Sequence, residues 1–216
     1  MNITKKHIVL FALFIVPLLF YILLQLGTHN FAKLPVLTKN VIDVSEISKE
    51  HKFDRKISIV TFLGNDINIV KSELFNLNQK IYKPFYDFKD FQFVVIAPKG
   101  TESDVVKLQG KLGEFTNMVK WNFIFATETE IKILFDSFKT NESLDNNLHS
   151  SKAFIIDKES SLRRGVTTNK SLSNSKLYGY NMASVAELKK DMVDDVKVIL
   201  AEYRLALKKN NADRQI

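Results

Sequence analysis

Cysteine is absent from this chain of 216 residues. Its absence excludes disulfides, thiol nucleophiles, cysteine-ligated zinc, iron–sulfur clusters and the acylated cysteine of a lipoprotein. Glycine is scarce, with seven residues, and the sequence has neither a G-x-S-x-G motif nor a glycine-rich phosphate loop. The chain therefore lacks the residues of thiol–disulfide exchange and the nucleophile turn of the α/β-hydrolases.

Dense basic runs interleaved with aromatic residues are also missing. Lysine and arginine number 31 against 24 for aspartate and glutamate, which gives a net charge of +7, but the lysines are scattered among acidic residues. This pattern favours a solvated basic surface, so we expect no nucleic-acid partner. A hydrophobic fraction of 45% with 17 phenylalanines is enough for the core of one ordinary domain.

The N-terminal region contains the longest uncharged segment, IVLFALFIVPLLFYILL at residues 8–24. Extended through residue 27, it reaches the length of about 20 residues that a membrane span needs. No A-x-A-like cleavage site follows, which favours an uncleaved anchor over a signal peptide, and a helix buried in a globular core usually has a polar face. Lys5 and Lys6 precede the segment and only Lys33 closely follows it, so the positive-inside rule places residues 1–7 in the cytoplasm and the domain in the periplasm or an equivalent space.

Alternating strand and helix patterns fill the remainder of the chain. After a lead-in or linker at residues 28–55, a domain is predicted at 56–209, with a polar tail at 210–216. Period-2 or continuous apolar runs predict strands, and apolar residues three and four apart predict helices. The predicted strands are 57–63, 91–97, 121–126, 153–157 and a hairpin strand at 162–166; the predicted helices are 67–83, 101–112, one with a stripe from Ile131 to Phe138, and one from Val185.

Three of these helices have capping-box patterns at their predicted starts, namely Thr101 with Asp104, Thr127 with Glu130, and Ser184 with Glu187. The order βαβαβα followed by ββα predicts a largely parallel sheet covered on both faces and closed by a hairpin. The predicted fold class is therefore α/β, a thioredoxin-like mixed sheet flanked by helices, preceded by one N-terminal transmembrane helix.

Four segments in this order resemble the Sco/SenC proteins, thioredoxin-fold copper chaperones of cytochrome oxidase assembly that are anchored by one N-terminal helix. They are the apolar N-terminal segment with its lead-in, "VVIAPKGTESDVVKLQGKLG", "KWNFIFATETEIKILF" and "LHSSKAFIIDKES". Pro98 matches a proline turn of the family, whereas Ala97 stands where the family has an aspartate. The resemblance spans about residues 35–207.

The family carries a C-x-x-x-C motif after its first core strand and a histidine in a later loop. The resemblance places Asn65 and Ile69 near the two cysteine positions and His149 at the histidine position. It thus implies that the histidine is kept and both thiolates are lost. Cu(I) selects soft sulfur ligands and thiol exchange needs a thiolate, so we expect no resident cofactor and no thiol–disulfide oxidoreductase activity.

Several residues have both a structural and a functional interpretation. Asn65 and Asp66 are suited to capping the helix that follows, or to forming a contact surface for a partner together with His149. His149 is interpreted as a hydrogen-bonding loop residue, with metal binding as the alternative; a hydrolase based on His149 and Ser150 is disfavoured, because neighbours in an extended segment point to opposite faces. Arg163 and Arg164 are expected on a solvated turn.

The sequence therefore predicts a membrane-anchored, non-catalytic, thioredoxin-like binding or assembly factor. Its expected partners are the membrane and a membrane protein such as a respiratory oxidase, and the oxidase connection rests on the resemblance alone. The alternative is a weak copper-binding protein that uses His149 with ligands from elsewhere. The least favoured interpretation is an enzyme whose reaction the sequence does not indicate.

Overall fold

The computed structural model describes residues 5–26, 33–172 and 175–212. The chain divides into two compact units, residues 1–32 and 33–216. The first holds α1, Lys5–Leu26, with Pro17 inside the helix. Among the described residues, no helix combines the length and the apolar character of a membrane span, so the transmembrane helix predicted at residues 8–27 is not found there. Residue 27 itself lies outside the described part of the chain.

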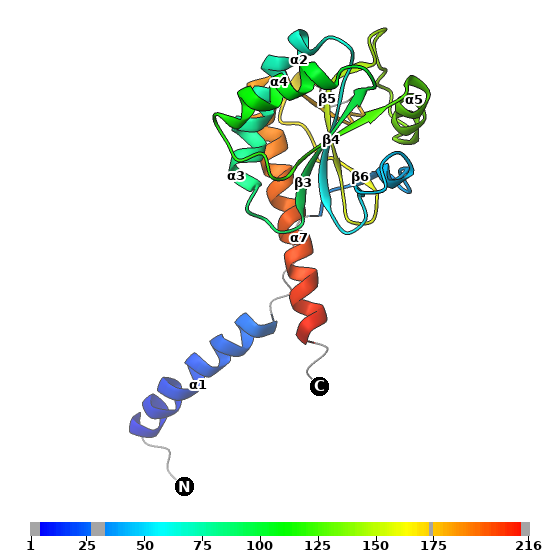
Figure 1. Cartoon of the computed structure of the whole chain (residues 1–216). Coiled ribbons are helices and arrows are strands. Elements are labelled where there is room, and N and C mark those ends of the chain that lie inside the picture. The colour runs from blue at the N-terminus through cyan, green and yellow to red at the C-terminus, as the bar shows by residue number, and fades with distance from the viewer. Residues whose placement is uncertain (1–4, 27–32, 173–174, 213–216) are drawn as a thin grey trace. The chain divides into compact units, whose positions relative to one another are not determined.

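The second unit is built on one mixed sheet (Figure 1). Its described strands are β1 (Val36–Thr38), β2 (Ile57–Leu63), β3 (Phe91–Pro98), β4 (Trp121–Ala126), β5 (His149–Ile156), β6 (Leu162–Arg163) and β7 (Tyr180–Asn181). They lie in the order β1-β6-β5-β2-β3-β4, and β7 pairs with β5. Strands β2, β3 and β4 are parallel, while β5 runs antiparallel to β2, as expected for a parallel core closed by a hairpin.

Helices cover both faces of this sheet. They are α2 (Ile67–Leu77), α3 (Lys83–Phe85), α4 (Glu102–Gly113), α5 (Glu128–Ser137), α6 (Val185–Glu187) and α7 (Val193–Ala212), with short 3-10 turns at Val44–Glu46 and Lys170–Leu172. Two π-helical segments, η2 (Asn78–Tyr82) and η4 (Leu188–Met192), join α2 to α3 and α6 to α7. The helix predicted for 67–83 therefore continues past Pro84, which lies in the first turn of α3 directly after the π-helical segment η2.

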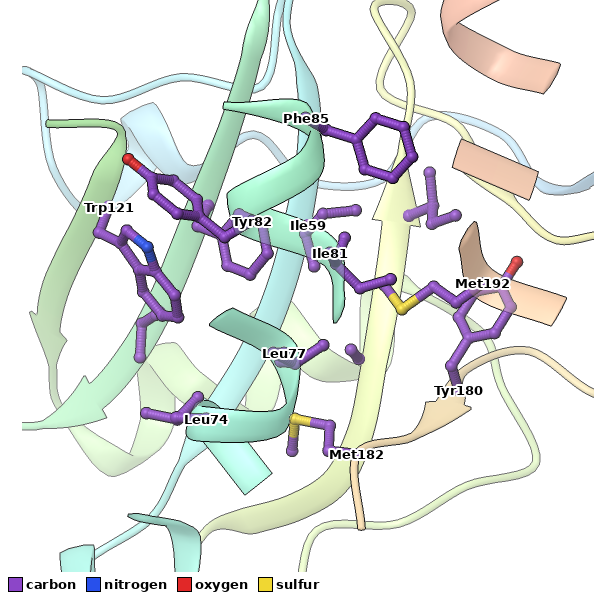
Figure 2. Close-up of a cluster of buried hydrophobic side chains, with 14 of the residues drawn as sticks. Ile59, Leu74, Leu77, Ile81, Tyr82, Phe85, Trp121, Tyr180, Met182 and Met192 are labelled. Atoms are coloured by element: carbon purple, nitrogen blue, oxygen red, sulfur yellow. The ribbon is translucent and has the colours of Figure 1, made fainter. Parts of the chain in front are cut away.

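Two hydrophobic cores lie on opposite faces of the sheet, because alternate residues of each buried strand point to opposite sides. In β2, Ile57 and Ile59 join the core beneath α2, α4 and α7, whereas Val60 and Phe62 join the core beneath α5. Figure 1 shows α5 on the other side of the sheet from α2 and α4. Figure 2 shows Leu74, Leu77 and Ile81 of the covering helix directed into the first core, which also contains Met182 and Met192.

The lead-in contributes to the domain from residue 33 onward. Val41, Val44 and Phe53 are buried in the core beneath α5. Asp43 holds this segment together, since its carboxylate accepts hydrogen bonds from the backbone N–H groups of Phe53 and Asp54, just before β2. The short strand β1 pairs with β6, which the sequence did not predict.

Two local predictions were wrong. Thr101 does not cap α4 with its side chain; its hydroxyl instead donates to the carbonyl oxygen of Pro98, 2.8 Å away. Arg163 and Arg164 do not lie on a solvated turn, because they are only 3% and 2% exposed. Their guanidinium groups are buried against carboxylates: Arg163 contacts Asp157 at 2.7 Å and Arg164 contacts Glu187 at 3.0 Å.

Candidate functional site

The candidate site begins at Gly64, where β2 ends. Gly64 has a φ of +73°, and a Cβ atom added there would lie 2.7 Å from both the carbonyl oxygen of Asn147 and the Cβ of His149. Only glycine fits this approach without strain. The next residue, Asn65, donates its backbone N–H to the same carbonyl oxygen of Asn147 at 2.8 Å. The loop after β2 is therefore closed against the loop that precedes β5.

The second loop, residues 145–149, is shaped by Asp145. Its Oδ1 accepts hydrogen bonds from the backbone N–H groups of Asn147 and His149, at 2.8 and 2.9 Å. Leu148 adopts a positive φ of 62° within this turn. His149 is the first residue of β5 and pairs with Leu63 of β2. This strand pairing places His149 beside the end of β2.

His149 is enclosed between two protein oxygens. Its Nδ1 lies 3.1 Å from the carbonyl oxygen of Phe62, and its Nε2 lies 3.3 Å from Oε2 of Glu73 on α2. The side chains of His149 and Glu73 are 13% and 10% exposed. Oε2 of Glu73 has no well-aligned hydrogen bond among the described residues, so the contact with His149 is an electrostatic one at close range.

The environment of His149 has opposing effects on its charge. Burial is the largest single influence, and it lowers the pKa of the imidazole. Three other influences raise this pKa and together outweigh burial: the contact with Glu73, the carbonyl oxygen of Phe62 and the charge of Asp145. The pKa of His149 is therefore raised above its ordinary value. A protonated His149 beside Glu73 forms a nearly buried ion pair at the end of β2.

Glu73 was missed by the sequence interpretation, although its spacing carried a signal. Val70, Leu74 and Leu77 form the buried stripe of α2, and Glu73 lies three residues after Val70 on the same face. An acidic residue in the apolar stripe of a helix needs a partner when it is buried. The partner is His149, which is distant in sequence and which only the tertiary fold brings to Glu73.

Asn65 and Asp66 lie exposed on the rim of a pocket of about 400 Å³, in front of α2. The pocket is also lined by Asn147 and by three lysines, Lys71, Lys107 and Lys111. Lys107 contacts Asp104 at 2.9 Å. His149 does not line this pocket, because it lies inside, beneath the loop. The side chain of Ile69, near the second cysteine position of the resemblance, lies outside the described residues.

The residues described here offer no group of three or more histidine, cysteine, aspartate or glutamate side chains that could hold a metal ion. Both ring nitrogens of His149 already face protein oxygens. A metal at His149 would have to displace Phe62 or Glu73 as its contact. The arrangement suits a structural ion pair better than an open coordination site.

Comparison with known proteins adds the fold class. No protein-family profile matches the chain, and no curated protein does. Among solved structures, it is similar to a "putative protein disulfide isomerase" from Bacteroides thetaiotaomicron, with 12% identity and a TM-score of 0.50, covering 79% of this chain and 95% of that chain.

Two further solved structures are more distant in shape. One is a SCO1/SenC family lipoprotein from Bacillus anthracis, with 15% identity and a TM-score of 0.44, covering 80% of this chain and 99% of that one. The other is the thioredoxin domain of a thiol-disulfide oxidoreductase from Bacteroides vulgatus, with 18% identity and a TM-score of 0.38, covering 63% and 87%.

The chain has a thioredoxin-like fold, as the sequence predicted, with a mixed sheet flanked by helices. At such low identity the similarity extends to the fold and not to the function. The chain has no cysteine with which to exchange disulfides.

Proposed function

We propose that this protein is a non-catalytic, thioredoxin-like binding or assembly factor. The observation that supports it is the closed end of β2, at which the family resemblance places the reactive cysteines. There, Gly64 and Asn65 are packed against Asn147, and the His149–Glu73 pair fills the interior. Asn65 and Asp66 remain exposed beside the lysine-containing pocket, and this surface is the proposed contact with a partner.

The proposal includes attachment to a membrane and a membrane-protein partner such as a respiratory oxidase. Support for attachment comes from the uncharged sequence at residues 8–24, with Lys5 and Lys6 before it. Support for the oxidase connection comes from the Sco/SenC resemblance alone. In this arrangement the domain would face the periplasm or an equivalent space.

The direct test is capture of partners by the full chain from its own detergent-solubilised membranes. Asn65→Arg places a long cation on the proposed contact surface, and Ser45→Arg is the matched control. Ser45 is exposed and next to Val44, in the segment that Asp43 ties to the start of β2, at the opposite end of that strand from Gly64. Both changes add one positive charge.

We expect the wild-type chain and Ser45→Arg to retain the same membrane proteins, identified by mass spectrometry, and Asn65→Arg to lose them. Oxidase subunits among those proteins would support the assembly role. Retention of all partners by Asn65→Arg, with the fold verified by circular dichroism, would reject this surface as the contact site.

The weak copper-binding alternative is tested by metal titration of the full chain. It requires stoichiometric copper that disappears in His149→Ala. The enclosure of both imidazole nitrogens leads us to expect no stoichiometric binding in either protein. Copper bound by the wild type and lost from His149→Ala would overturn the non-metal reading.

A further inference from the structure

A second pocket lies at the opposite end of the parallel strands from the candidate site. It has a volume of about 470 Å³ and is lined by residues of the segment before β2 and by the beginnings of β3 and β4. Parallel strands start on the same edge of a sheet, so the residues just before each of them converge. In this way Lys56, Lys89 and Lys120, which precede β2, β3 and β4, are brought together with Lys52.

The four lysines are poorly neutralised by the protein. Glu50 is the one carboxylate among the residues that line the pocket. Lys52 contacts Asp54 at 3.8 Å, but both side chains are more than half exposed, so the pair is weak. Lys56 and Lys89 have no carboxylate within ion-pair distance among the residues that the structure describes.

Lys120 is the most constrained of the four lysines. Its Nζ donates to the carbonyl oxygen of Phe88, which is a neutral acceptor. Burial and then the nearby charge of Lys56 lower the pKa of Lys120, and Asp87 and Asp90 counteract this only in part. Asp90 is itself engaged by Lys158. The pocket therefore holds more positive charge than Glu50 and the weak Lys52–Asp54 pair neutralise.

Amide side chains form a polar part of the same pocket. Gln92 is 6% exposed, and its Nε2 donates to the carbonyl oxygen of Lys52 and to the hydroxyl of Ser58, both at 2.8 Å. Asn122 donates to Oε1 of Gln92 at 3.2 Å. These bonds fix Gln92 and tie the lysine-bearing segment before β2 to the sheet, so the pocket is a preformed one.

We propose that this pocket binds a small anion carrying at least one phosphate group. Several flexible ammonium groups around one cavity suit a tetrahedral phosphate with oxygens in several directions, whereas a planar carboxylate is better matched by the arginine fork. The phosphate could belong to a soluble compound or to the headgroup of a phospholipid. The pocket is independent of the proposed partner surface, which lies beyond the other end of β2.

The test is calorimetric titration of the full chain in neutral detergent, at constant ionic strength. The titrants are pyrophosphate and, in a separate arm, a short-chain phosphatidylglycerol below its micelle concentration. The test variant is Lys56→Gln with Lys120→Gln. The control is Lys132→Gln with Lys197→Gln, which removes the same charge from exposed positions on α5 and α7.

We expect saturable binding of one anion by the wild type, a loss of about tenfold or more in affinity in the test variant, and a change of less than about twofold in the control. Preference for pyrophosphate would identify a soluble ligand, and preference for the lipid a headgroup; either supports the phosphate pocket. Absence of saturable binding to both titrants, or equal losses in the two variants, would overturn it.

A stability measurement separates ligand binding from a structural role. Because Lys56 and Lys120 repel each other, Lys56→Gln should leave the anion-free melting temperature unchanged or raise it, while diminishing the increase that pyrophosphate produces in the wild type. A lowered melting temperature without anion, together with an undiminished response to pyrophosphate, would contradict the proposal.

Discussion

At the scale of single residues, His149 shows how this fold uses a position that the family resemblance associates with copper. The residue is placed by β5, shaped by Asp145 and enclosed by Phe62 and Glu73. Its chemistry is that of an ion pair within the protein. Since Glu73 supplies the main favourable interaction with the imidazolium, the charge state of His149 should depend on that one carboxylate.

We therefore predict that Glu73→Gln lowers the pKa of His149. Burial lowers this pKa, and the variant removes the carboxylate that most strongly raises it. The measurement is an NMR titration of the histidine ring protons of the full chain. Glu142→Gln is the control, since Glu142 contacts Lys152 and not His149. An unchanged pKa in Glu73→Gln would show that the pair does not form in solution.

The same pair makes stability depend on pH. The folded-state pKa of His149 is raised above the ordinary value of 6.5, so its stabilising contribution is full below about pH 6.5 and is lost as the pH rises through the raised pKa. Denaturant titrations at a series of pH values should show the wild type losing stability over this range relative to Glu73→Gln. Parallel curves for the two proteins would contradict this account.

Gly64→Ala should be strongly destabilising. The left-handed φ costs about 1–2 kcal/mol for a residue with a Cβ, and the clash with the carbonyl oxygen of Asn147 and with His149 adds to it. Gly100→Ala is the matched control, because Gly100 also has a positive φ, of 98°, but a Cβ there meets nothing within 4 Å. A larger cost for Gly64→Ala than for Gly100→Ala would report the close approach in addition to the backbone strain, whereas a smaller cost would argue that the two loops are not packed together.

At the scale of elements, α5 is the clearest case of a helix whose start is set by its own sequence. Thr127 accepts a hydrogen bond from the backbone N–H of Glu130, and Glu130 accepts one from the backbone N–H of Thr127. The buried residues Ile131, Leu134 and Phe135 follow at helical spacing. All the information needed for this element lies within about a dozen residues.

Thr127→Ala should therefore cost about 1 kcal/mol of stability, the usual value of an N-cap side chain, measured by denaturant unfolding. Thr127→Ser keeps the hydroxyl and should cost much less. If Ala and Ser are equally destabilising, the lost contribution comes from the methyl group of Thr127 and not from the cap.

Comparison of predicted and observed elements shows where local information ends. The bounds of β2 and β4 were predicted correctly, because their mostly apolar runs end at a turn residue, Gly64, and at a capping residue, Thr127. The start of β5 at His149 was not, since the polar residues His149 to Lys152 become a strand only through pairing with β2 and β7. The π-helical segments are likewise invisible in the apolar spacing, which continues through them.

The same division between local information and contacts of distant segments applies to the candidate site. Sequence reasoning found Asn65, Asp66 and His149 from their positions relative to strands and loops. It missed Glu73 as the partner of His149, and it placed Arg163 and Arg164 in solvent. Each of these residues depends on a contact between segments far apart in the chain, such as the bond from Arg163 to the carbonyl oxygen of Leu34, which no local pattern contains.

At the scale of the whole molecule, the two buried arginines join the sheet to its surroundings. Arg163 contacts Asp157, Glu202 of α7 and the carbonyl oxygen of Leu34 in the lead-in. Arg164 contacts Glu187 of α6, donates to the carbonyl oxygen of Gly179 and lies 4.1 Å from the ring centre of Tyr180. Arg163 therefore joins β6 to the lead-in and to α7, and Arg164 joins the end of β6 to α6 and to the residues before β7.

Arg164→Met should destabilise the domain by about 3–5 kcal/mol, because it leaves Glu187 without its buried partner. Arg55→Met is the control; the side chain of Arg55 is 87% exposed and should contribute less than about 0.5 kcal/mol. Denaturant unfolding followed by tryptophan fluorescence of Trp121 measures both. A cost for Arg164→Met as small as that of Arg55→Met would show that the contacts of Arg164 do not support the fold.

The order of strands in the sheet has a consequence for how the protein is made. Strand β2 lies between β3 and β5, and β1 pairs with β6. The first two strands along the chain therefore pair with strands that are synthesised later. A nascent chain that ends before residue 149 exposes the open side of β2, and β1 has no partner until residue 163 has left the ribosome. The sheet can therefore be completed only after residues up to Arg163 have been synthesised, and until then the open side of β2 is an unpaired edge at which non-native strand pairing can occur.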